Sequence, residues 1–297
     1  MNRVFVICNG ESRQRMNLED LRQYGKIYGC NALYRDFTPD ALVAVDDRIV
    51  HKIYWSGYPL KNQCYFRDWN PMPAEAYEMI LLPEMIADDI DEVTPDMIFS
   101  NKRGDSKEFV VHGTHKDRMK DAEVAVREMD EKGAQILTEE VYDILFEGWG
   151  FHVSWLAEED MVQSTTAPGF IPGGDFGLGA GSLAHLISAW VEKPDEIYFI
   201  GMDLYSTDNK FNNVYKGTES YMGAGGNAVP PHEWILQHKT IMHRFPEIRH
   251  YKVNEKSLED PRIDPINRVI SEWNDTPNLE YLTHAELFGK LVASSVT

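Results

Sequence analysis

Polar residues able to bind a ligand stand directly after several apolar runs of this sequence. They are Asn9, Asn31, Asp46, Asp47 and Asp203, and Gly10 follows Asn9 as a position where the backbone can approach a ligand. If the apolar runs are neighbouring parallel strands, these residues meet at the carboxyl edge of one sheet, where open α/β sheets bind their ligands. Asparagine offers both a hydrogen-bond donor and an acceptor, which suits the edge of a base or a ribose. Each asparagine is equally typical of a turn or a helix cap, so both interpretations stay open.

A glycine-rich stretch, GGDFGLGAGS (173–182), precedes a helical run. Glycines let a backbone approach a phosphate, and a helix that follows adds free N–H groups and the positive end of its dipole. This predicts a ligand-binding role for Ala180, Gly181 and Ser182. The stretch is neither a P-loop nor a complete dinucleotide-binding fingerprint. A flexible loop before a buried helix is the alternative.

A long polar segment joins Asp203 to His232 and contains Tyr205 and Tyr215. Loops of this length are usually functional lids or disordered segments, so we expect residues 208–229 to be mobile without ligand and ordered with it. His232 stands near a predicted helix start, where the helix dipole favours a neutral imidazole. A neutral imidazole can take a proton from a hydroxyl nucleophile. A helix-cap or surface histidine is the alternative.

The apolar periodicity predicts the elements that would position these residues. Strands are expected at 4–8, 26–31, 41–46, 196–201 and 248–253, and helices at 17–24, 46–55, 183–192, 233–245 and 285–292. Strands that alternate with helices indicate an α/β, Rossmann-like fold whose mostly parallel sheet carries helices on both faces. We expect one such domain over 1–297. An insertion or lid subdomain is expected at about 70–165, with a charged helical stretch at 117–133.

Composition narrows the classes of partner. The chain has 297 residues, 43% hydrophobic residues and a formal net charge of −19. This acidity argues against nucleic acid as a partner. We expect neither a signal peptide nor a transmembrane segment, and a cytoplasmic location. Cys8, Cys30 and Cys64 lack the spacing of a disulfide scaffold or a zinc cluster, and the first two are expected in the core. The sequence leaves a homo-oligomer open.

Three segments together resemble a known enzyme family. VFVICNGES (4–12), YGCNALY (28–34) and DEIYFIGMDLYS (195–206) resemble the bacterial sialyltransferases of glycosyltransferase family 42, as does a histidine after a long loop. The resemblance covers roughly 3–47 and 175–255. It implies transfer of sialic acid or a related nonulosonic acid from a CMP-activated donor to a glycan acceptor, with no metal or other cofactor.

The resemblance also implies a role for each matching residue. Asn9 and Asn31 would hold the cytidine nucleotide, and Ala180 and Gly181, with Ser182 nearby, would lie at its ribose or phosphate. Tyr205 and, less closely matched, Tyr215 would hydrogen-bond the leaving phosphate. His232 would deprotonate the acceptor hydroxyl.

Two departures from the family pattern leave alternatives. GLGAG (177–181) stands in place of an Arg-x-Thr-Ser-Gly element, and VAVDD (43–47) ends in aspartates where the family has asparagine. TPDALVAVDD (38–47) resembles the motility accessory factors and 6-hydroxymethylpterin pyrophosphokinases instead. That resemblance implies a magnesium-dependent pyrophosphokinase in which Asp46 and Asp47 hold the metal. A binding or structural protein that keeps the fold without the chemistry is the third hypothesis.

Overall fold

The computed structural model divides the chain into two compact units. One comprises Met1–Val43 with Val162–Thr297, and the other Ala44–Met161. The residues that the structure describes are 1–46, 49–50, 52–53, 56, 58–67, 72–73, 107–112, 123–128, 153–156, 178–255 and 269–294.

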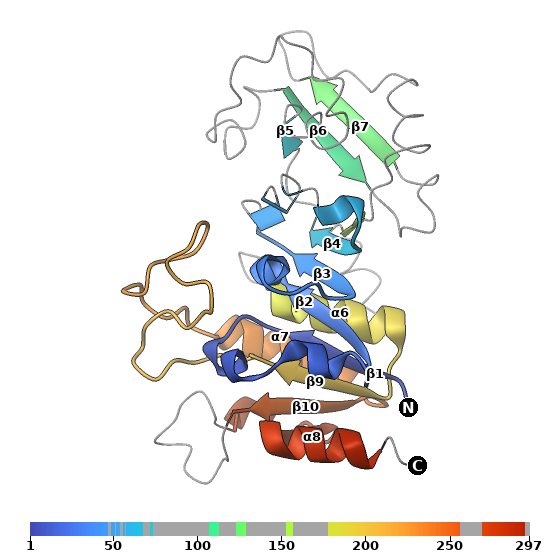
Figure 1. The fold of residues 1–297 in the computed structure, drawn as a ribbon, viewed down its shortest axis with the longest axis vertical. Helices are drawn as coiled ribbons and strands as arrows, with labels where there is room; N and C mark the ends of the chain where they lie inside the picture. Colours follow the sequence, from blue (N-terminus) through green and yellow to red (C-terminus); the bar gives the residue numbers. More distant parts are fainter. Residues whose placement is uncertain are drawn as a thin grey trace. The chain divides into compact units, whose positions relative to one another are not determined.

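The first unit is built on a parallel sheet (Figure 1). Its strands are β1 (Arg3–Ile7), β2 (Lys26–Cys30), β3 (Ala41–Ala44), β9 (Glu196–Ile200), β10 (Arg249–Asn254) and β11 (Leu279–Thr283). They lie in the order β11-β10-β9-β1-β2-β3, and every neighbouring pair is parallel. If the six strands are numbered along the chain, this is the 3-2-1-4-5-6 order of Rossmann folds. The chain adds strands toward one edge of the sheet up to β3 and toward the other edge from β9 on, so the order reverses between the parallel neighbours β1 and β9. The prediction of a Rossmann-like parallel sheet is confirmed.

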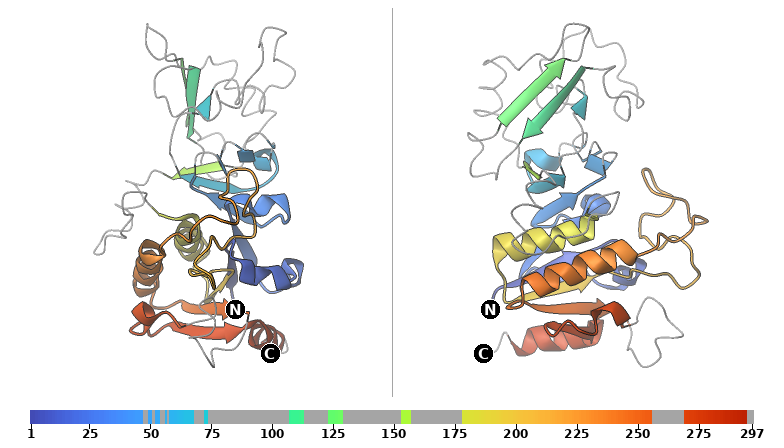
Figure 2. Two further views of the ribbon diagram at one scale, coloured as in Figure 1. Left: turned by 90° about the vertical axis from the view of Figure 1, so that its left-hand side faces the viewer. Right: turned by 180° about the vertical axis from the view of Figure 1, so that it is seen from behind.

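Helices cover both faces of this sheet. In Figure 2, α6 (Ala180–Glu192) and α7 (His232–Arg244) lie together on one face. The other face carries α8 (His284–Ala293) and the 3₁₀ turns η1 (Glu11–Arg15), η2 (Leu18–Leu21) and η3 (Asn31–Arg35). A further turn, η8 (Ser271–Trp273), packs on α7, where the indole of Trp273 donates to the Ile235 carbonyl at 2.9 Å. No helix within the described ranges combines the length and apolarity needed to cross a bilayer.

Most predicted elements of the first unit are confirmed within a few residues, and two differ. The helix expected at 17–24 is only the 3₁₀ turn η2, because its apolar residues Leu18 and Leu21 are spaced for one turn and the chain then enters β2. Strand β11 was not predicted. This strand lies at the edge of the sheet and is only partly buried. Its sequence, LEYLT, therefore lacks the continuous apolar run of a buried strand and alternates apolar and polar residues only weakly.

The second unit is described in short pieces. It contains η4 (Tyr58–Leu60), the parallel pair β4 (Cys64–Arg67) and β8 (Val153–Leu156), and an antiparallel sheet of β5 (Met72–Pro73), β6 (Lys107–His112) and β7 (Glu123–Glu128). The helix predicted at 117–133 is wrong over 123–128, where β-branched Val124 and Val126 alternate along β7. The helix predicted at 46–55 is found at its described residues Ile49, Val50, Lys52 and Ile53. Most of the insertion expected at 70–165 lies outside the described residues.

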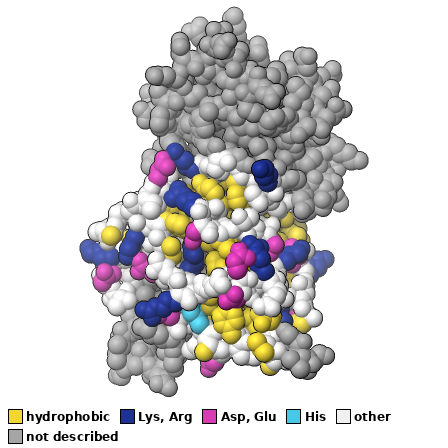
Figure 3. All heavy atoms as spheres, viewed as in Figure 1, with side chains coloured by type: hydrophobic (Ala, Val, Ile, Leu, Met, Phe, Trp, Pro, Cys, Tyr) yellow, Lys and Arg dark blue, Asp and Glu magenta, His cyan; other side chains and the backbone are white. Residues whose placement is uncertain are grey.

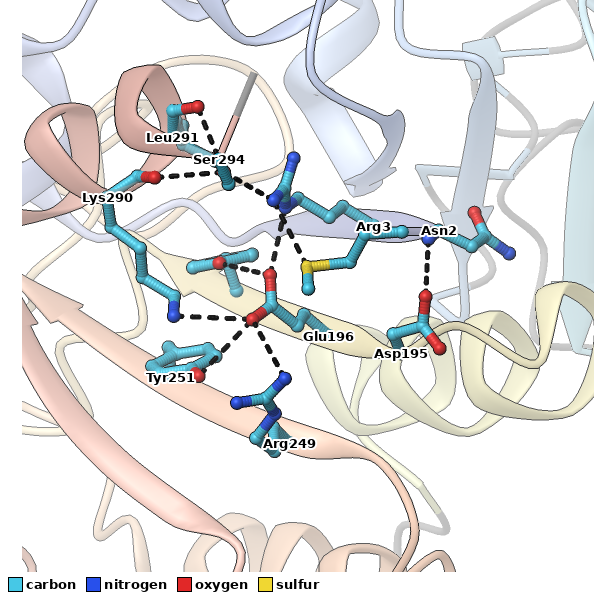
Figure 4. A network of polar contacts seen from close by, with 11 residues as sticks. Asn2, Arg3, Asp195, Glu196, Arg249, Tyr251, Lys290, Leu291 and Ser294 are labelled. Atoms are coloured by element: carbon cyan, nitrogen blue, oxygen red, sulfur yellow. Dashed lines mark hydrogen bonds and ion pairs between the residues drawn. The ribbon is translucent and has the colours of Figure 1, made fainter. Parts of the chain in front are cut away.

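A buried carboxylate ties the amino end of the sheet to α8 (Figure 4). Glu196 accepts from Arg3 Nε at 2.9 Å and from the Tyr198 hydroxyl at 2.7 Å, and Lys290 Nζ of α8 lies 3.3 Å away. Burial alone would raise the pKa of Glu196, but these partners outweigh it and hold the pKa below its usual value.

Three buried histidines form the core between the sheet and helices α6 and α7. His185 Nδ1 of α6 lies 3.0 Å from His238 Nδ1 of α7, and the ring of His250 from β10 packs edge-on against His185. Burial lowers the pKa of His185 well below its usual value and the pKa values of His238 and His250 to about 3. The cluster is therefore neutral at pH 7.

Candidate functional site

Asn9 follows β1 at the point where the strand order reverses. Its Nδ2 donates to the Cys30 carbonyl at the end of β2 (2.9 Å). Its Oδ1 is buried and has no hydrogen-bond partner among the described residues. Buried polar atoms are rarely left unpaired, so this carbonyl is the clearest open acceptor at the predicted ligand edge.

The first turn of α6 lies against the ends of β1 and β2. The Cys30 thiol donates to the Ala180 carbonyl at 3.6 Å, and a Cβ placed on Gly181 would lie 3.0 Å from Cys8 Sγ. Ser182 is 1% exposed, and its hydroxyl has no partner in the described part of the chain. The N–H groups of this turn have no acceptor within the helix. The start of α6 and the Asn9 side chain therefore both contact Cys30, at the end of β2.

The Asp203 carboxylate accepts hydrogen bonds from other side chains of the protein, rather than facing the open ligand site that the sequence predicts. It accepts from the Ser12 hydroxyl, from Ser12 N at 3.1 Å and from Asn212 Nδ2 at 2.9 Å. Burial raises its pKa, although these hydrogen bonds and the charge of Lys252 counteract the rise. Gly10 packs on the same group, because a Cβ there would lie 2.4 Å from Asp203 Cγ. The contact between Gly10 and Asp203 therefore holds the segment after β1 against the segment after β9.

The segment between Asp203 and His232 covers the ends of β1 and β2. Val214 N donates to the Asn9 carbonyl at 2.8 Å, and Glu11 N donates to Asn212 Oδ1 at 2.9 Å. Further along, Ala32 N donates to the Tyr221 hydroxyl at 3.4 Å. The segment also makes hydrogen bonds within itself: Phe211 N donates to the Gly226 carbonyl, and Ala228 N donates to the Asn209 carbonyl. Ligand-dependent ordering of 208–229 stays a prediction.

Tyr215 anchors this segment. Its ring is buried, and its hydroxyl accepts from Arg13 at 2.8 Å and donates to Asp36. Burial, and then the bond to Asp36, raise the pKa of Tyr215. Arg35 lies over the ring of Tyr215 and also over that of Tyr221. The phenol is thus already engaged within the protein.

His232 is the first residue of α7 and is exposed. Its imidazole makes no hydrogen bond or ion pair with the described residues. Two residues on, the Trp234 indole lies against Gly179, where a Cβ would be 2.7 Å from Nε1. Gln237 Oε1 accepts from Gly179 N at 3.2 Å. The start of α7 therefore lies beside the start of α6.

The remaining predicted residues are placed as follows. Tyr205 is half-buried beside Asp203, and its carbonyl accepts from Asn212 Nδ2 at 2.9 Å. Asn31 follows β2 with a φ of 48°, in the left-handed region that asparagine tolerates. Asp46 is exposed and belongs to the second unit, and Asp47 lies outside the described residues.

Among the side chains that the structure describes, no three His, Cys, Asp or Glu converge as metal ligands would.

Sequence reasoning missed the residues that fix this edge. Ser12, Arg13, Asp36 and Asn212 bind partners up to about 200 positions away, such as Arg13 to Tyr215. Their local sequence resembles ordinary polar turns.

Basic and acidic side chains are mixed on the surface of the chain. Figure 3 shows basic side chains lying next to acidic ones on the face turned to the viewer. Among the described residues, ion pairs join Lys216 to Glu11 and Lys26 to Glu192.

Compared with protein-family models, curated proteins and solved structures, the chain gives no match. The resemblance to glycosyltransferase family 42 therefore stays a prediction, and the site has to be judged by its own chemistry.

Proposed function

We propose that the chain binds a CMP-activated sugar, of the sialic or nonulosonic acid type, and transfers the sugar to a glycan hydroxyl. One observation carries the proposal. At the reversal point of a Rossmann sheet, the buried Asn9 Oδ1 and the buried Ser182 hydroxyl at the N-terminus of α6 both lack a hydrogen-bond partner among the residues that the structure describes. A ligand with a donor edge and a phosphate supplies what both groups need.

The nucleotide fits these two groups. The exocyclic amino group of cytosine is a donor that an amide carbonyl such as Asn9 Oδ1 can accept. The phosphate would take hydrogen bonds from Ser182 and from the free N–H groups of the first turn of α6. These groups need no arginine, which agrees with the absence of the Arg-x-Thr-Ser element.

The transfer step needs a base near the acceptor. In the proposed reaction His232 takes the proton of the acceptor hydroxyl while the acceptor oxygen bonds to the anomeric carbon. The bond from that carbon to the CMP phosphate oxygen breaks, and CMP leaves. Tyr205 would hydrogen-bond the departing phosphate, whereas we assign Tyr215 to holding the covering segment, because its hydroxyl already binds Arg13 and Asp36.

Turnover of a CMP-linked sialic acid with a panel of glycan acceptors tests this assignment. We expect His232→Ala to lower turnover by at least about 100-fold, the lower range for loss of a general base, with unchanged affinity for CMP. His243→Ala is the matched control, because His243 is an exposed histidine of the same helix. Equal turnover of the wild type and His232→Ala would overturn the assignment.

A thermal-shift comparison tests the nucleotide class. Stabilisation by CMP without Mg²⁺ supports the proposal, because a ligand that binds only the folded state raises the melting temperature. Stabilisation by ATP with Mg²⁺, and none by CMP, would overturn it in favour of a pyrophosphokinase. No shift with either would favour a fold that has lost the chemistry.

A further inference from the structure

Two free cysteines lie side by side at the same edge of the sheet. Parallel strands β1 and β2 pair up to Ile7 with Gly29, so Cys8 and Cys30 are the next positions in register. Both thiols lie against one turn of α6: Cys30 Sγ donates to the Ala180 carbonyl at 3.6 Å, and Cys8 Sγ lies 3.0 Å from where a Cβ of Gly181 would be.

The two thiols also contact each other and differ in exposure. A hydrogen bond with the Cys8 thiol, followed by burial, raises the pKa of Cys30 well above its usual value. Cys30 is 3% exposed, whereas Cys8 is partly exposed. Neighbouring strands place Cα atoms about 4.8 Å apart, within the range that a disulfide spans.

We propose that Cys8 and Cys30 form a redox-sensitive dithiol that low-molecular-weight disulfides oxidise. The Cys8 thiolate attacks one sulfur of the small disulfide and releases one thiolate. The Cys30 thiolate, its proton lost to solvent, then attacks Cys8 Sγ and releases the second. The protein gains one disulfide and loses two hydrogen atoms, and one small disulfide becomes two thiols.

This modification site is independent of the proposed function, although it adjoins the candidate site. Cys8 precedes Asn9, and the carbonyl of Cys30 accepts from the Asn9 side chain. A disulfide would therefore join the two strand ends that the Asn9 side chain bridges, next to its Oδ1 atom.

The experiment equilibrates the folded chain in glutathione redox buffers, quenches the exchange with acid, then alkylates the free thiols in guanidinium, which exposes the buried cysteines, and digests with trypsin. The three cysteines fall on different peptides, 4–13, 27–35 and 62–67. We expect the first two peptides to be joined, with the Cys64 peptide fully alkylated. The same exchange in guanidinium should join all three cysteines in mixed pairs, and the Cys8–Cys30 equilibrium constant should be at least about tenfold lower there.

Variants and a second probe complete the test. Cys30→Ser should stop at a glutathione adduct on Cys8, while Cys64→Ser should behave as wild type. Phenylarsine oxide, which binds paired thiols without oxidation, is added to the folded wild type, and it should protect both cysteines when the chain is then alkylated in guanidinium, where burial no longer shields Cys30. Full alkylation of Cys8 and Cys30 after both treatments, or a glutathione adduct without the crosslink in the wild type, would overturn the proposal.

Discussion

Single residues at the carboxyl edge serve the fold as well as the proposed chemistry. Gly10 illustrates this, because the Asp203 carboxyl group and the Gly201 carbonyl occupy the space that a side chain would need. The strand-end glycine expected to approach a ligand approaches a carboxylate of the protein itself. That contact closes the junction between β1 and β9.

We expect Gly10→Ala to destabilise the fold by at least about 1–3 kcal/mol, the usual cost of overpacking. A Cβ would lie 2.5 Å from the Gly201 carbonyl oxygen, a backbone atom that cannot turn away. Urea unfolding measures the change. Gly223→Ala is the control, because a Cβ there meets nothing within 4 Å. If Gly10→Ala and Gly223→Ala have the same free energy of unfolding, the junction has room for a Cβ at position 10, which would contradict the expectation.

Glu196→Gln tests the carboxylate at the opposite edge. The pKa of Glu196 is lowered in the folded chain, so its contribution to stability is present above about pH 4.5 and is lost as the pH falls through the folded pKa. We expect the variant to be less stable at pH 7, because Arg3 and Lys290 lose their counter-charge, and to lose less stability on acidification. Unfolding curves at pH 7 and pH 4 measure both effects. Parallel pH profiles of variant and wild type would contradict the expectation.

At the scale of elements, the segment over the strand ends depends on one buried phenol. Tyr215→Phe removes the hydrogen bonds to Arg13 and Asp36. We expect hydrogen exchange at 209–228 to accelerate about fivefold or more, since a lost buried hydrogen bond costs about 1–3 kcal/mol. Tyr281→Phe, which removes a hydroxyl bonded to Ile270 N outside the segment, is the control. Unchanged exchange in Tyr215→Phe would show that other contacts hold the segment.

The histidine core between α6, α7 and β10 predicts sensitivity to acid. Unfolded histidines take up protons near pH 6.5, whereas His238 and His250 stay neutral in the fold until about pH 3. The unfolded chain therefore binds more protons below pH 6.5, and stability falls as the pH drops. We expect a loss of about 1 kcal/mol for each of the three histidines between pH 6.5 and 5.5.

Unfolding curves at pH 7.5, 6.5 and 5.5 measure this loss. His243→Gln should keep it in full, because that histidine is exposed. His185→Leu should reduce it by about one third. A stability that stays constant from pH 7.5 to 5.5 in the wild type would contradict a neutral buried cluster.

At the scale of the whole molecule, the sequence predicts the sheet far better than the site. Buried parallel strands are continuous apolar runs, such as VFVI in β1, and they can be identified without knowing their neighbours. The strand order and the partners of Asp203 depend on residues far apart in the chain. Ser12 is 191 positions from Asp203, and no local pattern joins them.

The candidate site shows the same division. Asn9 and the start of α6 were predicted from a strand end and a glycine-rich turn, and in the structure Asn9 and Ala180 both contact Cys30. The engagement of Tyr215 and Asp203 by other side chains could not be predicted, because an inward-turned polar group and a ligand-binding one look alike in sequence.

Binding of CMP to the wild type and to Asn9→Ala, measured by calorimetry, tests the central claim most directly. Asn9 is a cleaner position than Asn31, whose φ of 48° would strain an alanine. Asn274→Ala, at an exposed asparagine, is the control. We predict that CMP binds the wild type and Asn274→Ala equally, and Asn9→Ala about 5- to 150-fold more weakly, the equivalent of about 1–3 kcal/mol. Equal affinity of Asn9→Ala and wild type, or no CMP binding by the wild type, would contradict the claim.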